Sequence, residues 1–319
     1  MDFTVIICTY NRAHNLPHCL YALARQIEIQ GIDWQVLVVD NNSTDNTPNM
    51  VRKLAIELPI AIRYEREAQQ GLNYARNTGI RASDSTYFSY IDDDIKVNSN
   101  WLSSIYAKFL EADADAVGGR IHLDPSIKLP KWIRPDTDMR GFLGYQDLGE
   151  APLQLDGVNR YPFGGNMAFH RRVVERIGYF NPLLGRRGSG FKRTELFKGA
   201  ETDYFRRLAT TGNARIFYEP KAIVYHQVLP VQLKKKYFRT IHYNAGYQRA
   251  YFDESKFPHL LFRIPRYFYP VLMRMTTKYI GQVILKGPDW AFRQQMNVAN
   301  LCGIMMGYRN RWKRHAKNF

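Results

Sequence analysis

Short apolar runs alternate with predicted helices over the first 91 residues, and this alternation limits the possible folds more than any other feature of the sequence. Each apolar run is too short for a helix and is typical of a buried strand. The runs lie at residues 3–8, 36–39, 60–64 and 87–91, and helices are predicted between them at residues 11–29, 41–58 and 71–82. Strands that alternate with helices indicate an α/β fold with a parallel sheet.

The pattern is less regular after residue 100. Helices are predicted at residues 101–110, 171–177 and 203–211, and strands at residues 116–119 and 216–226. Between these elements, residues 123–159 are rich in Pro, Gly and Asp and are predicted to form a long loop. Loops of this length in a compact domain usually serve as lids or binding loops.

Three of the predicted strands end in residues that can bind a ligand. Thr9 and Tyr10 follow the first strand, Asp40 ends the second, and Asp92-Asp93-Asp94 follows the fourth. Ligands bind at the carboxyl ends of the strands in parallel sheets. We therefore expect these residues to contribute to one binding site.

The triplet Asp92-Asp93-Asp94 is a candidate metal site. Three consecutive carboxylates repel one another unless a cation or solvent relieves the repulsion. Carboxylate oxygens suit Mg²⁺ and Mn²⁺, and both ions bridge diphosphates. A solvated turn with helix-capping aspartates explains the triplet equally well when it is considered alone.

Charge divides the chain into a nearly neutral body and a strongly basic tail. Residues 1–229 hold 28 Lys and Arg against 26 Asp and Glu, a net charge of +2, whereas residues 230–319 hold 17 against 3, a net charge of +14. A basic tail favours an anionic partner, either a membrane surface or a nucleic acid. A non-catalytic nucleic-acid-binding protein would not explain the acids at the strand ends, because they repel phosphates. We therefore expect no nucleic-acid partner.

Five segments of the body carry motifs in a characteristic order. They contain Thr9-Tyr10-Asn11-Arg12, Asp40-Asn41-Asn42, residues 71–80, the Asp-x-Asp motif at Asp92-Asp93-Asp94, and Gly164-Gly165-Asn166. This set resembles the family 2 glycosyltransferases of bacterial polysaccharide biosynthesis, and the resemblance covers roughly residues 3–229. It implies a GT-A fold, which is Rossmann-like with a mostly parallel mixed sheet flanked by helices. Residues 1–229 would form the catalytic domain, and residues 230–319 a basic α-helical extension that contacts a membrane interface or the acceptor.

The resemblance also implies a role for each matching residue. Thr9, Tyr10 and Arg12 would line the pocket of the nucleotide base. Asp40 would accept a hydrogen bond from the imide N–H of uracil, which makes a UDP-sugar the expected donor. The remaining residues expected to bind the nucleotide-sugar are Asn42, Arg76, Asp92, Asp93, Gly165 and Asn166.

The resemblance implies two metal ligands, Asp94 and His226. His226 ends the last predicted strand of the body. Imidazole is acceptable to Mn²⁺ and is a poor ligand for Mg²⁺, and the expected cofactor is Mn²⁺ or Mg²⁺. A histidine that only satisfies hydrogen bonds at a strand end is the alternative.

Inverting sugar transfer needs a carboxylate that takes the proton of the acceptor hydroxyl. In the family this base often lies in a Gly-Glu-Asp-x-Asp/Glu motif that opens a helix. The matching stretch here is Gly199-Ala200-Glu201-Thr202-Asp203, in which Ala200 replaces the first acid. Glu201 is the predicted base and Asp203 the alternative. Both acids would also be favourable as simple caps at a helix N-terminus.

The tail contains an amphipathic helical pattern at residues 260–286, with a kink predicted at Pro270. Four basic residues cluster on one side, namely Arg263, Arg266, Arg274 and Lys278, and the opposite side carries Leu261, Ile264, Phe268, Leu272, Met275 and Tyr279. No uncharged apolar run approaches the roughly 20 residues that a spanning helix needs. We expect this helix to lie on an anionic membrane surface. Packing of its apolar side on the body is the alternative.

The expected location is cytoplasmic, peripheral on the cytoplasmic face of the membrane, because the sequence opens directly into a predicted strand. A hexosyl or N-acetylhexosaminyl group would be moved to a saccharide or lipid-linked acceptor. A sugar-phosphate nucleotidyltransferase is the competing enzyme class. It would need a glycine-rich phosphate loop after the first strand, where Thr9-Tyr10-Asn11-Arg12 contains no glycine.

Overall fold

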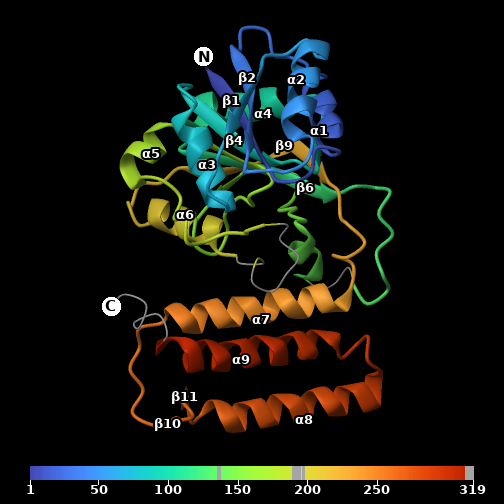
Figure 1. Cartoon of the computed structure of the whole chain (residues 1–319), viewed down its shortest axis with the longest axis vertical. Coiled ribbons are helices and arrows are strands. Elements are labelled where there is room, and N and C mark those ends of the chain that lie inside the picture. The colour runs from blue at the N-terminus through green and yellow to red at the C-terminus, as the bar shows by residue number, and fades with distance from the viewer. Residues whose placement is uncertain (135–137, 189–194, 196–197, 313–319) are drawn as a thin grey trace. The chain divides into compact units, whose positions relative to one another are not determined.

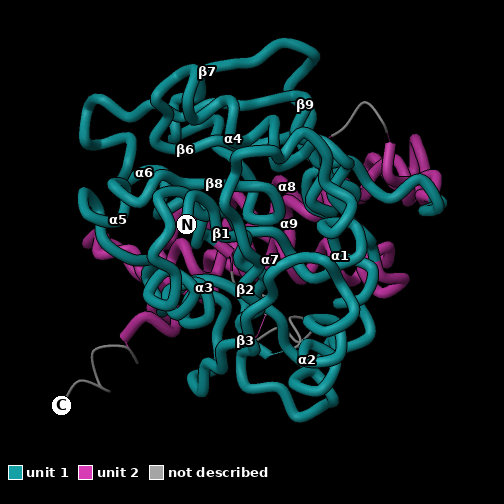
Figure 2. The backbone as a smooth tube through the Cα atoms, turned by 90° about the horizontal axis from the view of Figure 1, so that it is seen from above, with its two compact units in different colours: residues 1–128, 140–189, 199–228 teal, residues 129–139, 190–198, 229–319 magenta. Residues whose placement is uncertain are grey.

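The computed structural model describes residues 1–134, 138–188, 195 and 198–312. The chain forms two compact units, each with its own hydrophobic core (Figure 1 and Figure 2). The first unit comprises Met1–Lys128, Arg140–Ser189 and Gly199–Val228, and the second comprises Leu129–Met139, Gly190–Lys198 and Leu229–Phe319. The second unit therefore takes in two segments from the middle of the chain as well as the basic tail.

Nine strands of the described residues form one sheet in the first unit. They are β1 (Phe3–Thr9), β2 (Trp34–Asp40), β3 (Ile62–Arg66), β4 (Tyr87–Asp92), β5 (Ile95–Val97), β6 (Ala116–Leu123), β7 (Leu153–Leu155), β8 (Met167–His170) and β9 (Ile216–His226). Their order is β3-β2-β1-β4-β8-β6-β9-β5, and β7 also pairs with β9. Strand β1 is parallel to β2 and β4, whereas β8 is antiparallel to both of its neighbours. The sheet is therefore mixed.

Helices cover both faces of this sheet. They are α1 (Leu16–Leu23), α2 (Thr47–Glu57), α3 (Leu72–Arg81), α4 (Trp101–Ala112), α5 (Arg172–Ile177) and α6 (Ala200–Ala209). Successive side chains of a strand point to opposite faces. Val5 and Ile7 accordingly pack in the core with α1, α2 and α4, and Ile6 packs in the core with α3, α5 and α6. The predicted α/β fold with flanking helices is confirmed.

Two predicted boundaries need correction. The stretch at residues 123–159 is not entirely a loop, because it contains strand β7 and the 3₁₀ helix η1 (Asp138–Leu143). The helix predicted at residues 203–211 begins earlier, at Ala200. Gly199 precedes it with a φ of 101°, a backbone conformation that favours glycine. Glu201 and Asp203 therefore both lie in the first turn of α6.

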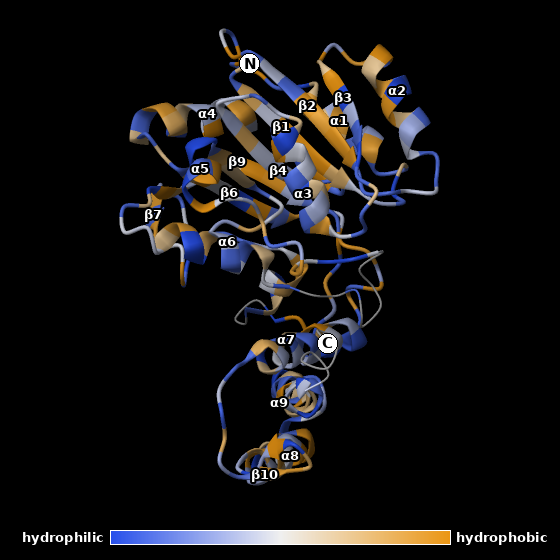
Figure 3. Cartoon of the chain, turned by 60° about the vertical axis from the view of Figure 1, so that its left-hand side comes forward, coloured by the Kyte–Doolittle hydropathy of each residue, from blue (hydrophilic) through white to orange (hydrophobic). Residues whose placement is uncertain are grey.

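The second unit contains three long helices and a short hairpin. They are α7 (Lys235–Phe252), α8 (Phe268–Lys286), α9 (Phe292–Asn310) and the pair β10 (Leu260–Leu261) and β11 (Ile264–Pro265). Helix α9 lies between α7 and α8 (Figure 1 and Figure 3). Helices α7 and α9 approach closely at glycines, since a Cβ atom on Gly303 would lie 2.0 Å from the carbonyl oxygen of Tyr243. The expected helical extension is present.

The amphipathic segment at residues 260–286 differs from its prediction. Residues 260–265 form the β10–β11 hairpin, and the helix begins only at Phe268. Pro270 lies in the first turn of α8 and not at a kink. Proline is tolerated there because the first N–H groups of a helix have no intrahelical partner. None of the described helices is both long enough and apolar enough to cross a bilayer.

Candidate active site

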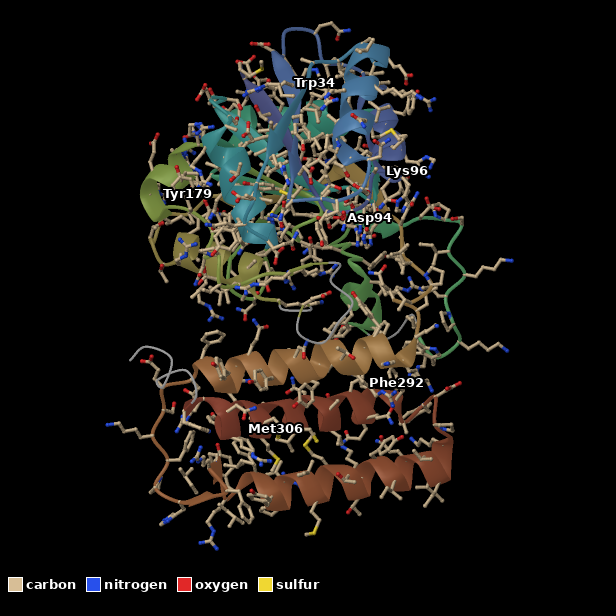
Figure 4. The ribbon with its side chains drawn as sticks, in the orientation of Figure 1. Trp34, Asp94, Lys96, Tyr179, Phe292 and Met306 are labelled. Carbon is tan, nitrogen blue, oxygen red and sulfur yellow. The ribbon has the colours of Figure 1, made fainter. Side chains whose placement is uncertain are left out.

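The carboxyl ends of β1, β2 and β4 meet at one edge of the sheet. In the parallel register Thr9 stands beside Asp40, and Cys8 stands beside Asp92. The sheet therefore brings the predicted polar residues of three separate segments together. Asp94 lies at this edge (Figure 4).

Arg12 and Thr9 hold the acidic triplet in place. The Thr9 hydroxyl donates to Asp93 Oδ2 at 2.7 Å. The Arg12 guanidinium donates from Nη1 to Asp93 Oδ1 at 2.9 Å and to Asp94 Oδ2 at 3.1 Å. Arg12 thus places positive charge against two adjacent carboxylates, which reduces their mutual repulsion. Burial nevertheless raises the pKa of the Asp93 carboxyl.

Asp92, Asp94 and His226 form a cluster with the geometry of a cation site. One ligand atom from each of these three residues lies within 4.8 Å of the others. His226 ends β9 opposite Ile95, and its Nδ1 lies 2.7 Å from the carbonyl oxygen of Leu143. If Nδ1 carries the proton and donates to that carbonyl, Nε2 faces Asp94 Oδ1, 3.3 Å away, with its lone pair.

The donor set fits a divalent cation. Within the described part of the chain, the buried Asp94 Oδ1 accepts no hydrogen bond. A buried carboxylate oxygen without a partner is costly unless a cation or another donor satisfies it. Burial alone would raise the pKa of Asp94, but the protonated form of His226 and the Arg12 guanidinium hold it below its ordinary value. The residue is therefore ionised at neutral pH, and two carboxylates with one imidazole suit Mn²⁺ better than Mg²⁺.

Asp40 is buried, and its carboxylate is held by two donors from the surrounding chain. Its Oδ1 accepts from the Ser43 backbone N–H at 2.8 Å, and its Oδ2 accepts from the Tyr64 hydroxyl at 2.8 Å. Burial and the Asp40 carboxylate raise the pKa of Tyr64 to about 12, so the hydroxyl keeps its proton. Each carboxylate oxygen has two acceptor sites, and Asp40 therefore retains acceptor capacity for a ligand.

Two other residues that were predicted to bind the nucleotide-sugar, Tyr10 and Asn42, lie close by in the chain. Tyr10 directly follows β1 and is half-buried. Asn42 follows Asp40 in a left-handed conformation with a φ of 66°, and its Oδ1 accepts from Arg66 at 2.9 Å. Both residues belong to the loops at the carboxyl ends of β1 and β2.

Arg76 pairs with Glu201, the predicted base. The Arg76 Nη2 donates to Glu201 Oε1 at 2.8 Å, and its guanidinium lies over the rings of Tyr90 and Phe180. Arg76 is 2% exposed. Burial alone would raise the pKa of Glu201, but Arg76 holds it below its ordinary value. Glu201 is therefore a fixed carboxylate that is ionised at neutral pH.

Two adjacent glycines connect the acidic triplet to this ion pair. A Cβ atom on Gly164 would lie 2.3 Å from Glu201 Oε1 and 2.5 Å from Arg76 Nη2. A Cβ atom on Gly165 would lie 2.8 Å from Ile95 Cδ1 and 3.3 Å from Asp92 Oδ2. The backbone at these glycines thus runs between the ion pair and the cation cluster, and a larger residue at either position would disturb one of them.

Two further predicted site residues, Asp203 and Asn166, have partners other than the cation cluster and the Arg76–Glu201 ion pair. Asp203 is partly exposed and pairs with Arg207 one turn along α6, at 3.0 Å. Asn166 is fully buried. Its side chain accepts from the Trp101 indole and donates to the backbone oxygens of Arg120 and Ala222. These bonds use the Asn166 amide to fix the core beside Gly165.

The model of glycosyl transferase family 2 matches residues 4–178, more than half of the chain. The chain belongs to glycosyl transferase family 2. This family 2 member is similar to the succinoglycan biosynthesis protein ExoM of Rhizobium meliloti, at 27% identity over 225 residues, or 70% of this chain and 65% of ExoM. Its matches to three curated relatives span 38% to 65% of the lengths of those relatives.

Solved structures of low identity show the same fold. TarS of S. aureus in complex with UDP-GlcNAc gives a TM-score of 0.55 at 16% identity, covering 100% of this chain and 92% of that one. The mannosyltransferase PcManGT from Pyrobaculum calidifontis, in complex with GDP-Man and Mn²⁺, gives 0.54 at 19% identity, covering 99% and 79%. The expected GT-A fold of this family 2 member is confirmed.

Sequence reasoning missed three features of this family 2 site. It considered the whole triplet as a metal site but named only Asp94 and His226 as ligands and gave Asp92 to the donor, whereas Asp92 belongs to the cation cluster as well. It did not find Tyr64, which lies in β3, or the Leu143 carbonyl, which lies in the stretch predicted as a loop. Of these three features, only the role of Asp92 could have been found from the sequence, because Asp92 stands at a strand end within the acidic triplet.

Proposed function

We propose that the chain is an inverting, metal-dependent glycosyltransferase that moves a hexosyl or N-acetylhexosaminyl group from a UDP-sugar to an acceptor hydroxyl. The observation that carries the proposal is the meeting of Asp40, the acidic triplet and His226 at one sheet edge. Membership of glycosyl transferase family 2 supports the reaction class.

The first loops and strand ends would hold the nucleotide. Thr9, Tyr10, Arg12 and Asn42 lie around the ends of β1 and β2, and Asp40 would accept the imide N–H of uracil. The UDP-GlcNAc complex of TarS supports a uridine donor, although PcManGT was solved with GDP-Man. Asp92 and Asp93 would contact the ribose and donor groups, with Gly165 and Asn166 beside the sugar.

Asp94 and His226 would hold Mn²⁺ or Mg²⁺, with Asp92 as a third ligand, and the Mn²⁺ in the PcManGT complex supports the first ion. A cation at this position supplies charge neutralisation for a leaving diphosphate. Arg12 already contacts the same carboxylates. It would have to share or release Asp94 when the cation binds.

Glu201 would act as the general base, with Asp203 as the alternative. The carboxylate takes the proton of the acceptor hydroxyl while the acceptor oxygen bonds to the anomeric carbon. The bond from that carbon to the diphosphate oxygen breaks, and UDP leaves with its electron pair. One displacement at one face of the sugar inverts the anomeric configuration. Arg76 would keep Glu201 ionised and oriented through its hydrogen bond to that carboxylate.

The acceptor would be a saccharide or lipid-linked saccharide in polysaccharide or glycoconjugate synthesis, on the cytoplasmic face of a membrane. The similarity to ExoM, a succinoglycan biosynthesis protein, supports this class. The net charge of +14 in residues 230–319 supports an anionic membrane surface as a partner.

Two other functions are less well supported. A sugar-phosphate nucleotidyltransferase would use a glycine-rich loop after β1, and Thr9-Tyr10-Asn11-Arg12 has no glycine. A nucleic-acid-binding protein would not need the buried acidic cluster.

The proposal is tested by measuring UDP release from a panel of UDP-hexoses and UDP-N-acetylhexosamines, with membrane extracts as the source of acceptor. We expect turnover with Mn²⁺ that stops when EDTA is added. Release of pyrophosphate from sugar phosphate and UTP, without UDP release, would identify the nucleotidyltransferase instead.

A further inference from the structure

Residues 260–290 of the second unit expose an unusual concentration of apolar side chains. Among the described residues, nine of the twenty large hydrophobic side chains that are exposed lie between residues 260 and 290. They are Leu260, Leu261, Phe262, Tyr267, Met273, Ile280, Ile284, Leu285 and Trp290. Exposed apolar residues that are scattered singly need no explanation, whereas a contiguous group indicates an interaction surface.

Helix α8 has two apolar sides, and one of them is already covered. Leu272 and Met275 pack against Leu301 and Met305 of α9. Gln294 and Gln295 of α9 donate to the Met275 carbonyl and the Tyr279 hydroxyl at 3.1 and 2.9 Å. The apolar side that the sequence predicted for a membrane therefore packs within its own unit.

The second apolar side of α8 faces outward. Met273, Ile284 and Leu285 are 70%, 77% and 81% exposed, and α8 contains no buried residue. At about 100° per residue, Met273, Ile280 and Ile284 form one strip along the helix. Arg274, Leu285 and Lys278 form a second strip, about 100° to 140° around the helix from the first.

The β10–β11 turn precedes α8 and carries a further exposed apolar side chain. Phe262 and Arg263 both have positive φ, at 50° and 68°, a conformation that costs energy in a residue with a side chain. Ile264 is buried against α9, and the Tyr269 hydroxyl donates to the Leu261 carbonyl at 2.9 Å. These contacts hold the turn, which leaves Phe262 75% exposed at its tip.

The charge of the segment that contains β10, β11 and α8 indicates which kind of partner it binds. Residues 255–288 contain six Lys and Arg and no Asp or Glu. Two copies of the chain that met through this face would bring cations against cations. A nucleic acid would leave Ile284, Leu285 and Phe262 without apolar contacts. An anionic bilayer satisfies both features, because cations meet lipid headgroups while apolar side chains enter the headgroup boundary.

We propose that α8 and the β10–β11 turn form a membrane-docking face that lies in the plane of an anionic bilayer. Phe262, Met273, Ile280, Ile284 and Leu285 enter the interface, and Arg274 and Lys278 contact the headgroups. The inference specifies the membrane partner named in the proposed function, and it does not require sugar transfer to occur.

The test is sedimentation of the full chain with phosphatidylcholine vesicles, with and without phosphatidylglycerol. We expect binding only to the anionic vesicles, and a loss of about tenfold or more for Ile284→Gln with Leu285→Gln. Glutamine is a good helix former, so α8 should persist in this variant. Ile56→Gln is the matched control, because Ile56 is 87% exposed on α2 of the first unit.

Phe262→Asn separates binding from folding. Asparagine tolerates positive φ, and the variant should therefore be as stable as the parent or more so, while it binds anionic vesicles less well. Unchanged vesicle binding in both variants would overturn the proposal. It would also be overturned if the parent chain self-associated in sedimentation velocity and the variants did not, because this face would then be a contact between copies. Asp94→Ala should still bind vesicles, which distinguishes failure of docking from failure of transfer.

Discussion

At the scale of single residues, Glu201 and Asp203 lie on the same turn of α6 but in different surroundings. Glu201 is held by the buried Arg76, and Asp203 by the more exposed Arg207. We expect Glu201→Gln to lower turnover by about 10²- to 10⁴-fold while UDP binding is retained. Its amide oxygen can still accept from Arg76, which keeps the fold intact. Asp203→Asn should stay near the parent rate.

The comparison of these two variants is decisive when donor binding and turnover are measured on the same preparations. Turnover at the parent rate in both variants would contradict the assignment of the base to either residue. A loss confined to Asp203→Asn would move the base to Asp203.

Tyr64 is expected to influence which nucleotide binds. Its hydroxyl donates to Asp40 Oδ2, and the Ser43 N–H donates to Oδ1. Uracil offers one imide N–H, whereas guanine offers two neighbouring N–H groups that favour both oxygens of a carboxylate. Tyr64→Phe frees Oδ2 and should narrow the preference for UDP over GDP in competition calorimetry. Tyr21→Phe, at an exposed tyrosine of α1, is the control. An unchanged UDP/GDP ratio would remove Tyr64 from base selection.

The position of most candidate site residues could be predicted from strand ends. Thr9, Asp40 and Asp92 meet because parallel strands end at one edge. The bridging position of Arg12, the Tyr64 hydroxyl and the Leu143 carbonyl could not be predicted. They depend on side-chain rotamers and loop paths that only the packed structure determines.

At the scale of elements, the contact between α7 and α9 depends on glycine. A Cβ atom on Gly303 would lie 2.0 Å from the Tyr243 carbonyl oxygen, a backbone atom that cannot rotate away. We expect Gly303→Ala to lower the free energy of unfolding by roughly 1–3 kcal/mol through overpacking. Denaturant unfolding followed by circular dichroism measures the change.

Gly281→Ala in α8 is the matched control, because a Cβ atom there meets nothing within 4 Å. Alanine favours the helix over glycine by about 1 kcal/mol, so this variant should be neutral or slightly more stable. Equal stability of the two variants would show that the helices separate without cost.

The helices of the tail were harder to predict than the strands of the body. Helix α7 was not predicted, because its buried side contains Asn244 and Gly246 among its apolar residues. These residues interrupt the hydrophobic period on which the prediction depends. The β10–β11 hairpin was missed because two non-glycine residues, Phe262 and Arg263, form its turn.

At the scale of the whole molecule, chemistry and charge are divided along the chain. The candidate active site lies in the first unit, and residues 230–319, with a net charge of +14, lie in the second. The sequence indicated this division through its charge. It did not indicate that residues 129–139 and 190–198 belong to the second unit, because that follows from tertiary contacts between distant segments.

The central claim is that the sheet edge of the first unit binds a nucleoside diphosphate through a divalent cation. It is tested most directly by calorimetric titration of UDP into the full chain, with Mn²⁺ and with EDTA. We predict binding with Mn²⁺ that is lost in EDTA and in Asp94→Ala, and that is kept in Asp84→Ala, an exposed acid before β4. UDP binding that is equal in EDTA, or unchanged in Asp94→Ala, would contradict the account.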